Sequence, residues 1–258
     1  MRSETQLSAG RSNTLSYVLL RIAATLSSMS YDDLLQVRSP ILTFYVLKGG
    51  EELYVIDTGF VSGWKLLQRA LHKRGWQSLP IRGVLLTHGH IDHSFNAMRI
   101  AKEYGAWIAA PRAEADHCLG RFRYSGLARV TGVLEAVART VFRFKPVSPD
   151  QWIDDSTTFP IWGGLQAVAL PGHSVGHTGF YCPSRKLLFS GDLFNSYFGI
   201  GYRPWGIFNS FPKDIPASIA KACALELDGV LPNHGDNSTP AMHLKRLRRL
   251  NEHLQKQV

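Results

Sequence analysis

The chain has 258 residues, a formal net charge of +9, 45% hydrophobic residues and 19% charged residues. These proportions are ordinary for a globular protein, exclude an extended disordered chain and leave room for a sizeable buried core. The three cysteines, Cys118, Cys182 and Cys223, are scattered and odd in number, so we expect no disulfide framework and a reducing, cytoplasmic location.

Residues 1–30 are predicted to be a peripheral N-terminal extension, and residues 31–258 to be a single domain. The stretch Leu15–Leu26 is mostly apolar, but Arg21 interrupts it. It is too short to span a membrane, and no convincing A-x-A cleavage site follows it. We therefore expect neither a transmembrane segment nor a secretory signal.

From about residue 40 onward, predicted strands alternate with predicted helices. β-rich apolar runs predict strands over 41–47, 53–56, 81–86, 107–110, 165–170, 179–182, 186–190 and 229–231. Helical spacing of apolar residues predicts helices over 64–74, 93–104, 215–226 and 242–256. This alternation is typical of an α/β protein (α+β in some schemes).

Residues 112–149 interrupt the alternation, and we expect a basic helical insert there. Residues 112–145 hold seven basic and three acidic residues, a net charge of 7 − 3 = +4. A second basic run, 245–249, lies near the C-terminus and is interpreted as a solvated helix face. The insert favours an anionic group on a substrate, with nucleic acid as a less favoured partner.

The most informative segment is Thr-His-Gly-His-Ile-Asp-His at residues 87–93. It places His88, His90, Asp92 and His93 directly after an apolar strand. Three imidazoles and a carboxylate crowded together without a cation would be poorly paired. Imidazole and carboxylate suit zinc and neighbouring first-row metals, so the segment predicts a metal site.

Three later segments also place a metal-ligating residue where a strand gives way to a loop. His173 follows the predicted strand 165–170, Asp192 follows 186–190, and His234 follows 229–231. Sites in open α/β sheets gather outside the carboxyl ends of strands. We therefore expect these three residues to join the first cluster.

The motifs THGHIDH, PGHSVGHTGF, SGDLF and NHGD, in this order, resemble those of the metallo-β-lactamase-fold hydrolases, and Asp57 in IDTG matches the first motif of the same series. The resemblance covers residues 40–240. It implies a four-layer αββα sandwich with a dinuclear site at one edge. One metal would take His88, His90 and His173, the other Asp92, His93 and His234, with Asp192 bridging them.

The same resemblance implies an enzyme that hydrolyses an ester, thioester or lactone-type carbonyl bond with a hydroxide bridging two zinc ions. Iron or manganese would also suit these ligands. Asp92 is the candidate catalytic residue, which would orient the hydroxide or accept a proton. His177 could orient a ligand or serve packing, and Asp57 is expected to support a loop or a ligand histidine.

The substrate stays open at this stage. Lactonases of this superfamily place a tyrosine three residues after the bridging aspartate, where this chain has Asn195. Glyoxalase II enzymes carry a C-terminal glutathione-binding region, and only 258 − 234 = 24 residues follow His234 here. β-Lactamases are normally exported. A mononuclear iron persulfide dioxygenase, or a nuclease or phosphodiesterase on the same fold, is the alternative.

Aromatic residues are concentrated after Asp192. They either form an apolar wall for a small-molecule substrate or pack an irregular loop: Phe194, Tyr197, Phe198, Tyr202, Trp205, Phe208 and Phe211. The first interpretation predicts a substrate with an apolar part. The oligomeric state is left open.

Overall fold

The computed structural model describes residues 31–122 and 124–256. The chain divides into two units, Met1–Asp32 and Asp33–Val258. The predicted extension, residues 1–30, lies outside the described residues, so its boundary stays a prediction. Among the described residues, no helix is both long enough and apolar enough to cross a membrane.

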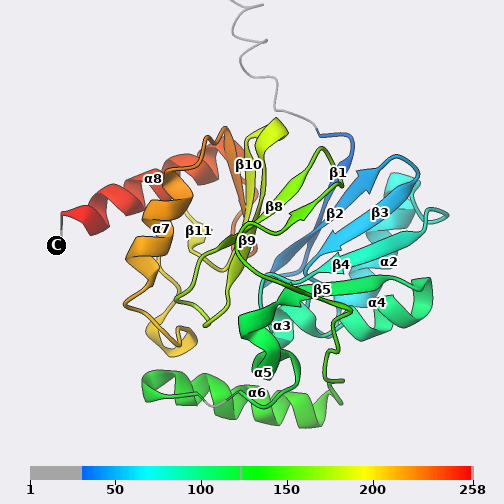
Figure 1. Ribbon diagram of the computed structural model, residues 1–258, viewed down its shortest axis with the longest axis horizontal. Coiled ribbons are helices and arrows are strands. Elements are labelled where there is room, and N and C mark those ends of the chain that lie inside the picture. The colour runs from blue at the N-terminus through cyan, green and yellow to red at the C-terminus, as the bar shows by residue number, and fades with distance from the viewer. Residues whose placement is uncertain (1–30, 123, 257–258) are drawn as a thin grey trace, which may run out of the picture. The chain divides into compact units, whose positions relative to one another are not determined.

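Two mixed sheets form the frame of the second unit (Figure 1). The first has six strands in sequence order: β1 (Leu34–Arg38), β2 (Thr43–Gly49), β3 (Glu52–Ile56), β4 (Ile81–Leu85), β5 (Trp107–Pro111) and β6 (Gln151–Ile153). The second has five strands in the order β13 (Gly229–Pro232), β10 (Leu187–Gly191), β9 (Thr178–Cys182), β8 (Leu165–Ala169) and β7 (Thr158–Phe159).

Helices cover the outer face of each sheet. Helices α2 (Gly63–Arg74) and α4 (Ala97–Tyr104) bury Leu67, Leu71 and Ile100 against the first sheet. Helices α7 (Ile215–Cys223) and α8 (Pro240–Gln255) bury Ile219 and Leu247 against the second. Each helix thereby removes one apolar face from water.

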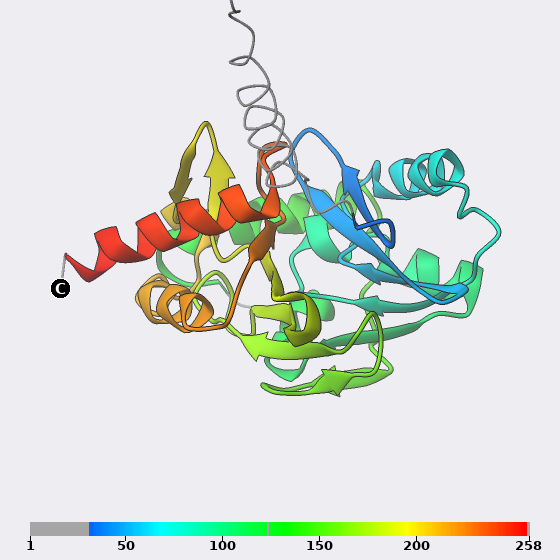
Figure 2. The same cartoon turned by 90° about the horizontal axis from the view of Figure 1, so that it is seen from above.

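The inner faces of the two sheets pack against each other through aromatic side chains. The rings of Tyr45 and Phe189 lie 5.1 Å apart edge to face, and those of Trp107 and Phe159 stack at 5.9 Å. Two sheets between two helical layers give the predicted four-layer αββα sandwich (Figures 1 and 2). The fold prediction is confirmed.

One predicted helix is divided in the structure. The helix predicted over 93–104 is two helices, α3 (Ile91–Ser94) and α4. The Asn96 side chain lies between them and donates hydrogen bonds to the carbonyl oxygens of Thr58, Gly59 and Phe60. This bonding to a neighbouring loop competes with a continuous helix.

The sequence analysis did not predict several short strands. These are β1, β6 and β7, together with the hairpin of β11 (Asn195–Tyr197) and β12 (Ile200–Tyr202). The insert contains the short helix α5 (Ala115–Cys118) and the longer α6 (Arg129–Val141). Short 3₁₀ turns, Gly126–Ala128 and Gly206–Phe208, lie in the insert and before α7. The segment predicted as an insert therefore contains two α-helices.

Candidate metal centre

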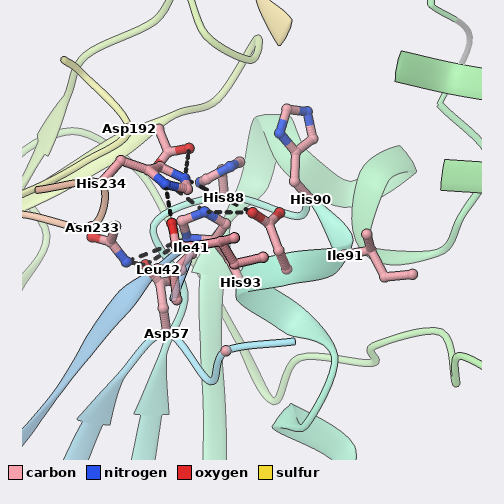
Figure 3. Close-up of polar contacts among 12 residues, drawn as sticks. Ile41, Leu42, Asp57, His88, His90, Ile91, His93, Asp192, Asn233 and His234 are labelled. Carbon is pink, nitrogen blue, oxygen red and sulfur yellow. Dashed lines mark hydrogen bonds and ion pairs between the residues drawn. The ribbon is translucent and has the colours of Figure 1, made fainter. Parts of the chain in front are cut away.

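Four strand ends bring seven ligand side chains to one edge of the two sheets. Figure 3 labels His88, His90, His93, Asp192 and His234 among them. His88 and His90 follow β4, and Asp92 and His93 lie in α3. His173 follows β8, Asp192 follows β10 and His234 follows β13. All seven residues predicted from the sequence are therefore close together.

The seven side chains form three overlapping groups. Within each group the ligand atoms lie within 4.8 Å of one another: His88, His90 and His173; His88, His93 and Asp192; Asp92, His93 and His234. The first and third groups are the two ligand sets that the sequence motifs imply.

Asp192 lies between these two sets. Its Oδ2 atom is 3.4 Å from Nε2 of His173 and 3.1 Å from Nε2 of His234, and its Oδ1 atom is 3.3 Å from Nε2 of His93. One carboxylate thus reaches imidazoles of both sets, which is the position that a bridging ligand needs.

Unpaired buried atoms show that these residues fit a metal. The Nε2 atoms of His88, His90 and His93 and Oδ1 of Asp192 are buried, and the described residues offer them no hydrogen-bond partner. Such atoms cost roughly 1–3 kcal/mol each when left without a partner. Two cations, one in each ligand set, would satisfy all four.

The electrostatics of the cluster support the same conclusion. Burial, together with the neighbouring imidazoles, holds the pKa of His88 well below its usual value, and burial likewise lowers the pKa of His90 and His173. These three histidines are therefore neutral near pH 7, the form that binds metals.

Carboxylates are closer to the ligand set of Asp92, His93 and His234. Burial alone would lower the pKa of His93, but the carboxylates of Asp192, Asp92 and Asp57 outweigh it and raise that pKa. Burial opposes ionisation of Asp192, yet His234 and His93 hold its pKa well below the usual value. Without a cation, the protein itself supplies positive charge at this position.

A buried carboxylate behind the site orients His93. Asp57 Oδ2 lies 3.0 Å from Nδ1 of His93 and accepts hydrogen bonds from Thr87 Oγ1 and Asn233 Nδ2 at 2.8 and 2.7 Å. Its Oδ1 atom accepts the backbone N–H of Thr87 at 2.8 Å. Asp57 therefore directs Nε2 of His93 toward the site, a support role of the kind predicted for it.

His177 supports Asp192 in a similar way. Its ring contacts the backbone of Asp192, and the preceding Gly191 has a φ of 55°. A Cβ atom on Gly191 would lie 2.5 Å from Nε2 of His177. Both the left-handed conformation and this close approach favour glycine at position 191.

Sequence reasoning missed a second group of buried residues behind His90. Glu114 accepts the backbone N–H groups of Gly89 and Gly176 at 2.9 and 2.6 Å. Burial opposes its ionisation, but contact with His117 outweighs this and lowers the pKa of Glu114 to about 2. Glu114 thus ties the THGHIDH loop to the loop before His177.

Helix α6 contributes Glu135 to the same region. Its Oε1 atom accepts the backbone N–H of Ile91 at 3.0 Å, and its Oε2 atom accepts Tyr124 Oη–H and Arg139 Nη2–H at 2.9 and 3.1 Å. The buried ring of His117 lies 5.2 Å from that of His90. The sequence held one indication of this role, because Glu135 is the single acidic residue of the otherwise apolar and basic helix α6.

A pocket of about 280 Å³ opens over the ligands. Its remaining walls come from α3, α6, β11 and the segment before α7, through Ile91, Thr131, Leu134, Glu135, Ala138, Asn195, Pro204 and Phe208. Among the predicted aromatic residues, Phe208 lines the pocket, whereas Phe194 is buried in the core and Phe198 is exposed. The aromatic segment therefore contributes to the wall through one ring.

The arrangement can bind one or two cations beside a largely apolar cavity that also contains the carboxylate of Asp92. Nδ1 of His234 is 2.6 Å from the carbonyl oxygen of Ile41, which leaves Nε2 facing Asp192. These are features of a catalytic centre with room for water and substrate.

Comparison with known proteins agrees with this geometry. A family model described as the metallo-beta-lactamase superfamily matches residues 42–244. The probable metallo-hydrolase YybB of Bacillus subtilis is 28% identical over 163 residues, which are 61% of this chain and 64% of that protein. The hydroxyacylglutathione hydrolase of Brucella anthropi is 26% identical over 162 residues, 63% of this chain and 49% of that protein.

The chain thus spans less than two thirds of each of these two relatives. Among solved structures, the metallo-beta-lactamase family protein TTHA1429 from Thermus thermophilus superposes with a TM-score of 0.67 at 22% identity, over 86% of this chain and 79% of that one. The subclass B3 metallo-beta-lactamase BJP-1 of Bradyrhizobium japonicum gives 0.64 at 23% identity, over 88% and 90%. These two likenesses establish the fold.

Proposed function

The chain belongs to the metallo-beta-lactamase superfamily, and we propose that it is a metal-dependent hydrolase that cleaves an ester, thioester or lactone-type carbonyl bond. One observation carries the proposal. Seven ligand side chains converge around Asp192 and leave buried ring nitrogens without a hydrogen-bond partner among the described residues. A cluster of this kind beside an open pocket suits catalysis better than packing.

We assign His88, His90 and His173 to one zinc ion and Asp92, His93 and His234 to a second, with Asp192 shared. Zinc is favoured because the donors are imidazole and carboxylate groups; iron or manganese is the alternative. When bound, such ions polarise a carbonyl oxygen and lower the pKa of water.

The protein's own residues would then orient the metal ligands and accept the proton of the attacking water. Asp57 holds His93, and His177 holds the backbone of Asp192, so both ligands keep their orientation without a substrate. Asp92 lies on the pocket wall with its Oδ2 atom 3.9 Å from Nε2 of His234. We assign Asp92 Oδ2 as the acceptor for the proton of the attacking water.

The pocket supports a substrate with an apolar part. Ile91, Leu134, Ala138 and Phe208 line it together with five of the metal ligands, His90, Asp92, His173, Asp192 and His234. The relatives from Bacillus and Brucella are named as a metallo-hydrolase and a hydroxyacylglutathione hydrolase, which favours a carbonyl substrate and, through the latter, a thioester. A cytoplasmic location fits such a small-molecule substrate and stays a prediction.

The test is a substrate screen on purified protein whose metal content has been measured. About two zinc ions per chain, with turnover of an aryl ester, thioester or lactone, is the expected result. A single iron with oxygen consumption would favour the dioxygenase alternative, and turnover of phosphodiesters alone would favour a nuclease.

Two variants and a control locate the activity. His88→Ala and Asp192→Ala should abolish turnover and lower the metal content while the circular dichroism spectrum stays native. His72→Ala, on the exposed surface of α2, should behave as the wild type. Full activity in either ligand variant would contradict the assignment of the site.

A further inference from the structure

Helix α6 exposes an aliphatic stripe along one face. We define the stripe by the residues that form it: Val130, Val133, Leu134, Val137 and Val141. Their side chains are between 49% and 65% exposed. The spacing of three and four residues places all five on one side of the helix. Five adjacent aliphatic side chains facing water are unusual and mark an interaction surface.

The rest of the structure fixes which way this stripe faces. On the opposite side of α6, Glu135 bonds to Tyr124, Arg139 and the backbone of Ile91, and Thr131 Oγ1 donates to the carbonyl oxygen of Ile207. These contacts anchor the helix to the body of the unit. Figure 1 shows α6 along one border, away from both sheets. The stripe is therefore held outward.

The surroundings of the stripe are strongly basic. Residues 121–145 contain six basic residues and one acidic residue, a net charge of 6 − 1 = +5. Arg129 begins α6 and Arg143 lies just beyond its end, and both are exposed. The single acidic residue, Glu135, is buried and paired. An apolar face with a basic border is complementary to an anionic lipid surface.

An exposed aromatic pair lies in the segment that packs against α6. Trp205 is 67% exposed, and its ring stacks on Phe208 at 6.4 Å with an interplanar angle of 21°. Both belong to the segment that Thr131 of α6 contacts through Ile207. Tryptophan is enriched where proteins meet the interface of a bilayer, because its ring is apolar and its N–H is polar.

We propose that α6 docks the protein on an anionic lipid bilayer, with the stripe inserted at the interface and Arg129 and Arg143 near the headgroups. The helix has 13 residues, far fewer than a bilayer span requires, so it would lie in the plane of the interface. A second copy of the chain is a poorer partner, because two segments of charge +5 would face each other.

Docking would place the metal pocket beside the membrane. Leu134 belongs to the stripe and also lines the pocket, and Phe208 lines the pocket next to Trp205. If the proposed hydrolase function holds, the substrate would reach the metals from the lipid phase along α6. The docking itself is independent of turnover and is measured without it.

The experiment is flotation of the full chain with large unilamellar vesicles at low and high salt. Vesicles of phosphatidylcholine and phosphatidylglycerol should carry the protein, vesicles of phosphatidylcholine alone should carry far less, and salt should weaken binding. The variant Val133→Gln/Val137→Gln should bind at least about tenfold more weakly. The matched control, Val61→Gln/Ile200→Gln, removes two exposed aliphatic side chains elsewhere and should bind normally.

A second pair of variants tests the charge. Arg129→Gln/Arg143→Gln should weaken binding to anionic vesicles roughly tenfold, and Lys73→Gln/Lys102→Gln should not. Absence of binding to anionic vesicles, or equal binding by the wild type and the stripe variant, would overturn the proposal. Sedimentation velocity completes the test, since a dimer that the stripe variant dissociates would identify a second copy as the occupant instead.

Discussion

The Nε2 atom of His177 accepts a hydrogen bond from the backbone N–H of Asp192 at 2.9 Å. On the other side of the ring, Nδ1 donates to the carbonyl oxygen of Leu170, also at 2.9 Å. Burial lowers the pKa of His177, so the ring stays neutral and keeps both roles at pH 7. The imidazole joins the end of β8 to the residue that we assign to both metals.

This relationship predicts the effect of His177→Ala. The variant leaves the buried N–H of Asp192 without a partner, which should reduce the free energy of unfolding by roughly 1–3 kcal/mol. Metal affinity should fall about ten- to a hundredfold, because Asp192 loses its fixed position. Urea unfolding and competition with a chelator measure the two effects, with His72→Ala as the control. Unchanged metal affinity would show that His177 serves packing alone.

Asp57→Asn tests the support behind His93. The oxygens of Asp57 accept from four donors, and an amide can offer only one acceptor oxygen to them. Asparagine tolerates the left-handed backbone at this position, where φ is 59°, so the loop should keep its path. We expect about tenfold to a hundredfold weaker metal binding with native circular dichroism. Asp214→Asn, on the exposed surface, is the control.

Leu134→Gln tests the apolar wall of the pocket. For p-nitrophenyl esters of increasing acyl length, KM should rise roughly threefold to tenfold for the octanoate and little for the acetate, with kcat nearly unchanged. Val133→Gln changes the neighbouring residue, which does not line the pocket, and should leave both values unaltered in a vesicle-free assay. The same change in KM for all esters would show that Leu134 does not recognise the acyl chain of the substrate.

His243, which is not one of the seven ligands, gives the stability a pH dependence. Burial is the main cause that lowers its pKa to about 4; its ring contacts Ser196 Oγ at 2.7 Å. Because the folded pKa is below the unfolded value of about 6.5, the unfolded state binds more protons between these values. The contribution of His243 to stability should be complete above about pH 6.5 and decrease by roughly 3 kcal/mol as the pH falls to about 4.

Urea unfolding between pH 4 and 7, with the metal removed, measures this dependence. His243→Gln should flatten the curve over that interval, whereas His72→Gln should not. A curve of the same slope in His243→Gln would assign the loss to other groups.

The ligand cluster could be predicted from the sequence because each ligand is recognised from its neighbours in the chain. His88, His90, Asp92 and His93 are adjacent in the chain, and the other three ligands each follow a recognisable apolar strand. Both sheets were likewise predictable where their strands are apolar, as at Ile81–Leu85. The division between α3 and α4 at Asn96 could not be predicted, because it depends on carbonyl groups in a loop about 36 residues away in the sequence.

The role of the buried residues behind the ligands could not be predicted from the sequence either. Glu114 and His117 lie in a basic insert that carries no recognisable pattern, and their role depends on contact with Gly89 and Gly176. The short strand β6 exists through pairing with β5, a distant partner in the sequence, rather than through propensity. Non-local contacts of this kind leave no periodic signal in the sequence.

The contact between the two sheets has a consequence for the timing of synthesis. Tyr45 Oη donates to the carbonyl oxygen of Pro232 across 187 residues of chain, and Pro232 is two residues before His234. A nascent chain that has reached only α7 therefore lacks both β13 and the last ligand. The seven-ligand site can be completed only after β13 and His234 have been synthesised and have left the ribosome.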